Sequence, residues 1–269
     1  MMKKIAKAAS LIFMLELIPA GSWALNAIEP TIPFYRVWRG FPMPGLTTPG
    51  FLDRLQPFIV DTRTWLTGHQ GVAYLPVVPP AGSPANIPGE LAIVAYTSQA
   101  DYEKEKATPV GKQYQDSHWT LFEKPGPRSK SGGPSPYNGE IVMDTPYDAA
   151  RVPVDWQSPS GQARFFLGKI KDGTSLNQLA DLVSRTQREF ATQGLDGHIV
   201  VADSNRFMAT WQHWRSQEEA ERAARSDAGQ KITEVRDSLL EPLLDAPAAL
   251  FDGNVRQGGV YNVRFTPQP

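Results

Sequence analysis

The sequence contains no cysteine, and this absence excludes several kinds of chemistry. Disulfide bonds, thiolate metal sites and cysteine nucleophiles all require a thiol, and so does the lipid anchor of a bacterial lipoprotein. An excess of charge of one sign is also lacking, because 27 basic and 28 acidic residues leave a net charge of −1. The surface therefore offers no basic field to nucleic acid, and we expect no nucleic-acid partner.

Histidine is scarce, and its spacing does not predict a metal site. The four histidines are His69, His118, His198 and His213, and no two of them are spaced as in His-x-x-x-His or His-Glu-x-x-His. The sequence also lacks a Gly-x-Ser-x-Gly elbow, a phosphate-binding loop and a dinucleotide-binding fingerprint. We therefore expect no metal and no cofactor.

Long apolar runs are absent, apart from a short run near the N-terminus. Three lysines precede the apolar residues 8–14, and Ser22-Trp23-Ala24 supplies the small residues that signal peptidase needs. An uncleaved membrane anchor is the alternative, but it would need about 20 apolar residues, and Glu16 and Pro19 interrupt this segment. We expect residues 1–24 to be a signal peptide cleaved after Ala24. The mature protein would then be periplasmic or secreted, with no membrane partner.

Beyond residue 24, hydrophobic periodicity predicts two halves, 25–152 and 162–269, joined by a Pro- and Ser-rich linker at 153–161. Each half has the element order β-α-β-β-α-β. In the first half we expect strands at 34–39, 71–78, 90–96 and 140–144, a helix ending near residue 68, and a helix from about 99 to 122 that is broken at Pro109. In the second half we expect strands at 163–171, 198–202, 206–214 and 260–265, and helices that begin after Ser175 and Ser216.

The two halves also share a motif at equivalent places. Tyr96-Thr97-Ser98-Gln99 ends a strand and begins a helix, and Trp214-Arg215-Ser216-Gln217 does the same in the second half. In each half the helix that follows this motif is interrupted, and a glycine lies at the interruption: Gly111 in the first half and Gly229 in the second. The serine-to-glycine separation is the same in both. We interpret the halves as a tandem repeat.

The stretch from Trp211 to Ser226, together with its counterpart from Tyr96 to Tyr114, resembles the third strand and second helix of the dimeric α+β barrel superfamily, which includes the antibiotic-biosynthesis monooxygenases. The resemblance implies an α+β fold in which two ferredoxin-like halves hide the apolar faces of their sheets against each other. Since both halves lie in one chain, this would be an intramolecular α+β barrel, either a monomer or a homodimer. Two independent ferredoxin-like domains are the alternative.

Haem-degrading members of this superfamily carry a histidine on the helix that follows the strand-end tryptophan. The corresponding positions here are Ala224 and Lys106. The resemblance therefore does not extend to haem, and the expectation of no cofactor is unchanged.

Five residues are candidates for a ligand-binding site: Arg36, Trp38, Trp211, His213 and Arg264. An arginine among aromatic residues can hold a planar or anionic ligand, although its stem can also simply cover a sheet face. His213 shares a strand face with Trp211. If this face lines the barrel interior, His213 is a weak candidate for an acid–base group; otherwise it is a structural histidine.

Three functions remain open on the sequence alone. The first is an exported soluble protein that binds a small apolar or aromatic ligand between its two sheets. The second is a cofactor-independent monooxygenase or isomerase, as the resemblance allows. The third is a non-catalytic interaction module with a filled barrel, which would make contact through the loops at 41–50, 79–89 and 124–139.

Overall fold

The computed structural model describes residues 33–265, except for 129 and 132–139. The predicted signal peptide, 1–24, lies outside these described residues. Within them, no helix is both long enough and apolar enough to span a membrane.

The first half builds an antiparallel sheet with the order β2-β3-β1-β4. Its strands are β1 (Phe34–Gly40), β2 (Gly71–Val77), β3 (Glu90–Tyr96) and the short β4 (Lys130–Ser131). Its helices are α1 (Thr48–Gly68), α2 (Gln99–Lys106) and α3 (Pro109–His118). The predicted break is present, because Thr108 caps α3 and accepts a hydrogen bond from the N–H of Gly111. The third helix, α3, ends at His118, whereas the sequence predicts that the helix continues to residue 122.

The predicted strand at 140–144 is wrong. Ile141 packs in the core beneath the helices of the second half, and Asp144 has a φ of 66°, which interrupts an extended backbone. The fourth strand of the first sheet is instead β4, which pairs with the edge of β1 at Trp38 and Arg39.

The second half builds a sheet with the order β5-β7-β8-β6-β9. Its strands are β6 (Gln162–Ile170), β7 (Leu195–Asp203), β8 (Phe207–Trp214) and β9 (Leu240–Pro247), with the two-residue β5 (Tyr147–Asp148) at one edge. Its helices are α4 (Leu176–Phe190), a 3₁₀ turn (Ala191–Gln193), α5 (Gln217–Arg225) and α6 (Asp227–Leu239). Ser175, Ser216 and Ser226 cap α4, α5 and α6.

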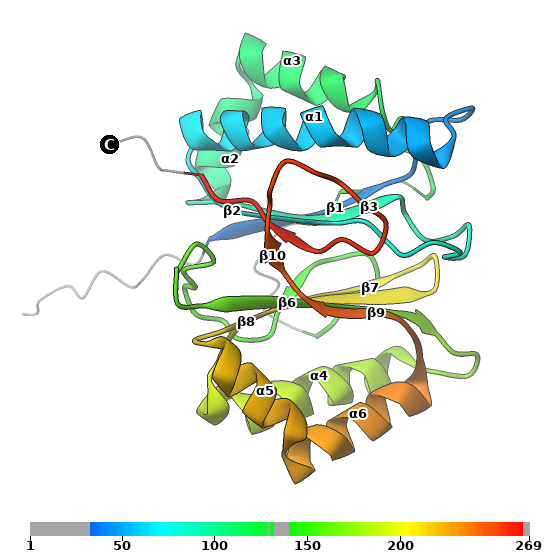
Figure 1. Cartoon of the computed structure of the whole chain (residues 1–269), viewed down its shortest axis with the longest axis vertical. Helices are drawn as coiled ribbons and strands as arrows, with labels where there is room; N and C mark the ends of the chain where they lie inside the picture. Colours follow the sequence, from blue (N-terminus) through cyan, green and yellow to red (C-terminus); the bar gives the residue numbers. More distant parts are fainter. Residues whose placement is uncertain (1–32, 129, 132–139, 266–269) are drawn as a thin grey trace, which may run out of the picture.

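The predicted strand at 260–265 lies in a different place from the one expected. The fourth strand of the second sheet is β9, whereas the C-terminal segment runs along β2 of the first sheet (Figure 1). A bridge pairs Val77 with Val260, and the N–H of Val263 donates to the carbonyl of Tyr74 at 3.0 Å. Within this segment β11 (Tyr261–Asn262) pairs in parallel with β10 (Ala249–Leu250).

The two halves thus exchange their edges. The segment that follows the fourth strand of each half joins the sheet of the other half: β5 pairs with β7, and the C-terminal segment lies against β2. Figure 1 shows the two sheets face to face, with α1–α3 outside the first and α4–α6 outside the second. This is the predicted intramolecular α+β barrel.

The space between the sheets is filled by a continuous apolar core. Val37 and Ile93 from the first sheet meet Phe165 and Trp211 from the second. Trp156, from the segment predicted to be a linker, is fully buried among them and donates from its indole Nε1 to the hydroxyl of Tyr35 at 3.0 Å. Residues 153–161 therefore do more than connect the halves, because their tryptophan completes the core.

Candidate functional site

A ligand site between the two sheets is not found in the described part of the chain, because buried side chains occupy that space. Trp211 is one of them, and its indole Nε1 donates to the carbonyl of Leu75 at 3.3 Å. His213 also lies on this inner face, with Nδ1 2.6 Å from Oδ1 of Asp196 and its ring against Trp156. Its Nε2 is packed against Gly161, where an added Cβ would come within 2.2 Å. This geometry favours the structural alternative for His213.

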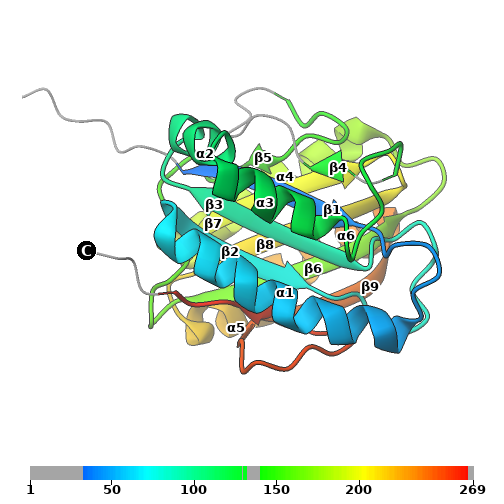
Figure 2. The same cartoon turned by 90° about the horizontal axis from the view of Figure 1, so that it is seen from above.

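The other three candidate residues lie in two different places. Arg264 donates to the carbonyl of Ser158 at 3.0 Å and ties the C-terminal segment to residues 153–161. Arg36 and Trp38, in contrast, point to the outer face of the first sheet and line a cavity of about 280 Å³ beneath α1, α2 and α3. In Figure 2 these three helices lie over the strands of the first sheet. We call this space the first-half cavity.

Aromatic side chains form most of the walls of the first-half cavity. The rings of Trp65 and Tyr114 stack at 4.8 Å with only 6° between their planes. The ring of Trp38 meets that of His118 edge-on at 4.9 Å. The Phe, Tyr and Trp residues that line it are Trp38, Phe58, Trp65, Tyr74, Tyr96, Tyr102, Tyr114 and Trp119. Flat walls of this kind suit a planar ligand.

Cationic side chains are present at the end of the cavity nearest to α2. Arg36 donates from Nη1 to the hydroxyl of Tyr102, and its guanidinium lies 4.6 Å from the centre of the Tyr102 ring. The ammonium group of Lys106, also on α2, lies 5.5 Å from the centre of the same ring. Arg36 is half-buried, so its charge is screened less than that of an exposed arginine.

His118 is held in a defined orientation at the C-terminal end of α3. Its Nδ1 is 2.9 Å from the carbonyl of Tyr114, so the ring proton lies on Nδ1 and Nε2 is left as an acceptor. Burial among aromatic rings lowers the pKa of His118 to about 4, and the nearby positive charge of Arg36 adds to the effect. His118 is therefore neutral at pH 7.

Glu90 contributes the carboxyl group of the cavity and is fully buried. The hydroxyl of Tyr74 donates to Oε1 at 3.3 Å. Burial raises the pKa of Glu90 to about 8, while the hydroxyl of Tyr74 and the nearby indole N–H of Trp38 lower it less strongly. The group is therefore mostly protonated at pH 7.

The second half has a smaller cavity of about 120 Å³ at the same place, between its sheet and its helices. Strand register and helix caps identify the equivalent positions in the two halves. On the strands they are counted from Tyr96 in the first half and Trp214 in the second, and on the helices from Gly111 and Gly229. The equivalent pairs are Arg36 and Arg164, Trp38 and Phe166, Tyr74 and His198, Glu90 and Met208, and His118 and Arg236. Only the arginine on the first strand is common to both halves.

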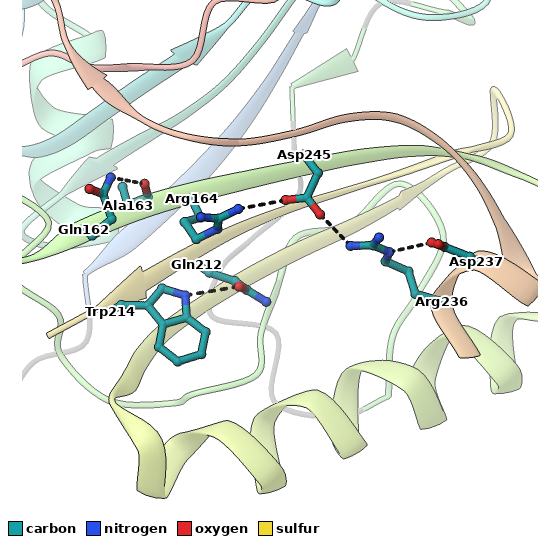
Figure 3. Close-up of polar contacts among 8 residues, drawn as sticks. All are labelled: Gln162, Ala163, Arg164, Gln212, Trp214, Arg236, Asp237 and Asp245. Atoms are coloured by element: carbon teal, nitrogen blue, oxygen red, sulfur yellow. Dashed lines mark hydrogen bonds and ion pairs between the residues drawn. The ribbon is translucent and has the colours of Figure 1, made fainter. Parts of the chain in front are cut away.

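A polar network occupies part of the space beside the second-half cavity (Figure 3). Asp245 accepts from Arg164 at 3.3 Å and from Arg236 at 2.7 Å, and Arg236 also donates to Asp237 at 2.9 Å. The guanidinium of Arg236 lies 4.3 Å from the centre of the Phe166 ring. Since Asp245 engages both arginines, the second half offers no uncompensated cation to a ligand there.

Metal binding finds little support in this geometry. Within the residues described, no three His, Asp or Glu side chains come together as metal ligands. Among the described residues that line the first-half cavity, His118 is the one histidine.

Comparisons with known proteins find similar solved structures but no similar family or curated sequence. No protein-family model and no curated protein sequence matches the chain. An anthrone oxidase-like protein is 10% identical over 87% of this chain and 92% of its own, with a TM-score of 0.43. A ferredoxin-fold protein related to antibiotic biosynthesis monooxygenases, from Listeria monocytogenes, is 9% identical over 78% of this chain and 88% of its own, with a TM-score of 0.33. A chlorite dismutase variant from Candidatus Nitrospira defluvii is 12% identical over 78% of this chain and 86% of its own, with a TM-score of 0.34. Likeness at this level concerns the fold and transfers no activity.

Sequence reasoning therefore identified two cavity residues, Arg36 and Trp38, and missed Glu90 and His118. Glu90 begins a predicted strand, where a carboxylate is usually exposed. The sequence signal that could have identified it is its own strand, since Glu90, Ala92, Val94 and Tyr96 alternate on the same face.

Proposed function

We propose that this protein binds a planar aromatic anion in the first-half cavity. The observation that carries the proposal is the combination of aromatic walls with Arg36 and Lys106 as the charged lining residues at neutral pH. Glu90 and His118 add no charge there, because one is mostly protonated and the other is neutral. An aromatic ligand would stack on the walls, and its anionic group would pair with the guanidinium of Arg36.

The size of the first-half cavity limits the ligand. A volume of about 280 Å³ is close to the lower end of small-molecule pockets, which begin near 300 Å³. This space suits a molecule of about two or three fused rings. Export to the periplasm or the medium remains part of the proposal, and its support is the N-terminal pattern of lysines, apolar residues and Ser22-Trp23-Ala24.

The experiment is a calorimetric titration with 6-ethyl-2-naphthoate as the probe. We expect Arg36→Ala to weaken binding about tenfold, because the variant loses a half-buried charge-assisted contact. Arg164→Ala is the matched control, since Arg164 holds the equivalent position in the second half and pairs with Asp245. The control should bind like the wild type. Absence of binding to the wild-type protein, or an equal loss in both variants, would overturn the proposal.

A second candidate function is a cofactor-independent monooxygenase or isomerase. The observation in its favour is that two groups able to exchange protons, Glu90 and His118, line the same cavity. Native mass spectrometry of protein purified from its own exported compartment would test this candidate. A retained molecule that the protein converts to another species supports catalysis, whereas one that it releases unchanged supports binding alone.

A further inference from the structure

We propose that Glu90 and Trp38 together recognise an acceptor oxygen, such as a ketone or quinone carbonyl, at the inner end of the first-half cavity. The inference rests on the proposed function, because it specifies the group that the aromatic ligand presents at this end. It would also make Glu90 a residue that determines ligand specificity.

The strand register places these two side chains beside each other. Glu90 lies directly opposite Gly40 on β1. A Cβ at Gly40 would come within 2.5 Å of the indole Nε1 of Trp38 and of the ring of Phe122, so both rings pack over the glycine. The indole N–H of Trp38 is also close enough to the Glu90 carboxyl to lower its pKa. The absence of a side chain at Gly40 therefore lets the indole nitrogen approach the carboxyl.

These two groups are not satisfied by the rest of the described chain. Trp38 Nε1 and Glu90 Oε2 are both buried, and neither has a hydrogen-bond partner among the described residues. The two groups lie near each other but not in hydrogen-bond geometry. Buried polar atoms are normally paired, so a ligand atom that pairs with both would remove an unfavourable feature of the free protein.

The protonation state defines which ligand atom fits. Tyr74 donates to Oε1 of Glu90, so the proton of the neutral carboxyl belongs on Oε2. Below its pKa of about 8, Glu90 therefore presents a donor, as Trp38 Nε1 does. Two donors converge on an oxygen that carries no hydrogen. Above this pKa the carboxylate would repel the same oxygen.

The position of Arg36 defines how the ligand would be oriented in the cavity. Arg36 lies opposite Val94, four residues along β3 from Glu90, which is about 13 Å at the usual rise of a strand. The ligand would place its carbonyl near Glu90 and its anionic group near Arg36. Met208 replaces Glu90 in the second half, so we expect no such recognition there.

The cavity is also lined by ionisable groups other than Glu90. Those facing it are Arg36 on β1, Tyr74 on β2, Tyr96 on β3, Tyr102 and Lys106 on α2, and Tyr114 and His118 on α3. Burial raises the pKa values of Tyr74, Tyr96 and Tyr114, and His118, with a pKa of about 4, is neutral above pH 6. Among the lining groups whose pKa is shifted, Glu90 is the one that changes charge near pH 8.

The test uses two probes that differ by one carbonyl oxygen at the end opposite the carboxylate: 6-acetyl-2-naphthoate and 6-ethyl-2-naphthoate. At pH 6.5 we expect the wild-type protein to bind the ketone about fivefold to tenfold more tightly, which is the usual net value of a hydrogen bond. This preference should decline as the pH rises from 6.5 to 9.5.

Two variants assign the effect to Glu90. Glu90→Gln keeps an N–H donor, so its preference for the ketone should persist at both pH values. Glu90→Met, which carries the residue of the second half, should bind both probes equally. Equal affinities of the wild-type protein for the two probes at pH 6.5, or an unchanged pH dependence in Glu90→Gln, would overturn this inference alone. If the wild-type protein binds neither probe, the proposed function fails as well.

Discussion

At the scale of single residues, a few side chains decide which half of the molecule has an aromatic cavity. Where the first half has His118, the second has Arg236, whose guanidinium covers Phe166 and pairs with Asp245. Where the first half has Glu90, the second has Met208. These changes occur on the same scaffold of strands and helices. The chemical character of each cavity is therefore set by side chains rather than by the fold.

A second feature at the scale of single residues is the buried ion pair of Arg39, which concerns the stability of the fold. Its guanidinium is fully buried, 2.6 Å from Asp203 and 3.5 Å from Asp144. Because Arg39 lies on β1 and Asp203 on β7, the ion pair joins the two sheets. Leu167 holds the equivalent position on β6, so the second half has no such arginine.

We predict that Arg39→Ala lowers the free energy of unfolding by about 3–5 kcal/mol, because it leaves the carboxylate of Asp203 buried without its charged partner. Denaturant unfolding monitored by circular dichroism measures the change. The double variant Arg39→Leu/Asp203→Asn removes both charges and keeps an acceptor for the N–H of Asn205, so it should recover most of the loss. A loss below about 1 kcal/mol in the single variant would show that the pair contributes little.

At the scale of elements, the two halves break their second helix in the same way. Thr108 caps α3 one residue after Ala107, the C-cap of α2, and Ser226 both ends α5 and caps α6. Each accepts a hydrogen bond from the N–H of a glycine three residues on, Gly111 or Gly229. A Cβ on either glycine would come within 2.2 or 2.1 Å of a carbonyl of the preceding helix. The bend therefore requires a residue without a side chain. The shared geometry is consistent with a tandem repeat, which remains a prediction.

We expect Gly111→Ala and Gly229→Ala each to destabilise the protein by about 1–3 kcal/mol, because the added methyl forces the two helices apart. Thermal and denaturant unfolding give the change. Gly68→Ala is the control, since nothing lies within 4 Å of a Cβ at that helix end. If all three variants unfold alike, close packing at the helix break is not what selects glycine.

At the scale of the whole molecule, the two sheets depend on each other. Their apolar inner faces form one core, Trp156 is buried within it, and each sheet has an edge completed by the other half. Burial of this much apolar surface is favourable only while the halves stay together. The exchange of edge segments also protects the edges of β2 and β7 from pairing with other chains.

This dependence predicts that the two sheets remain associated when the chain is cut between β4, the last strand of the first sheet, and β5, which joins the second sheet. A specific protease site would replace residues 132–139 in the full-length protein. After cleavage, size-exclusion chromatography with light scattering should give the mass of the intact chain, although a denaturing gel shows two fragments. An uncleaved sample is the control. Separation of the fragments under native conditions would contradict a shared core.

The candidate site was only partly predictable, for a physical reason. The alternation on β1 revealed Arg36 and Trp38 as neighbours on one face. Glu90 and His118 reach the same cavity from a strand start and a helix end, and nothing local connects them. Their altered pKa values come from burial by residues that are distant in the sequence. Glu90 and His118 were therefore not visible in the sequence as parts of one site.

The sequence by itself determined most strands, the helices, their caps and the order of elements, because these depend on residues three or four positions apart along a helix and on alternation along a strand. Only the tertiary structure decided three other features. The space between the sheets is filled, the C-terminal segment lies against β2 rather than in the second sheet, and the cavity lies beneath α1, α2 and α3. Each of these depends on packing between distant segments, and periodicity cannot show which face meets which partner.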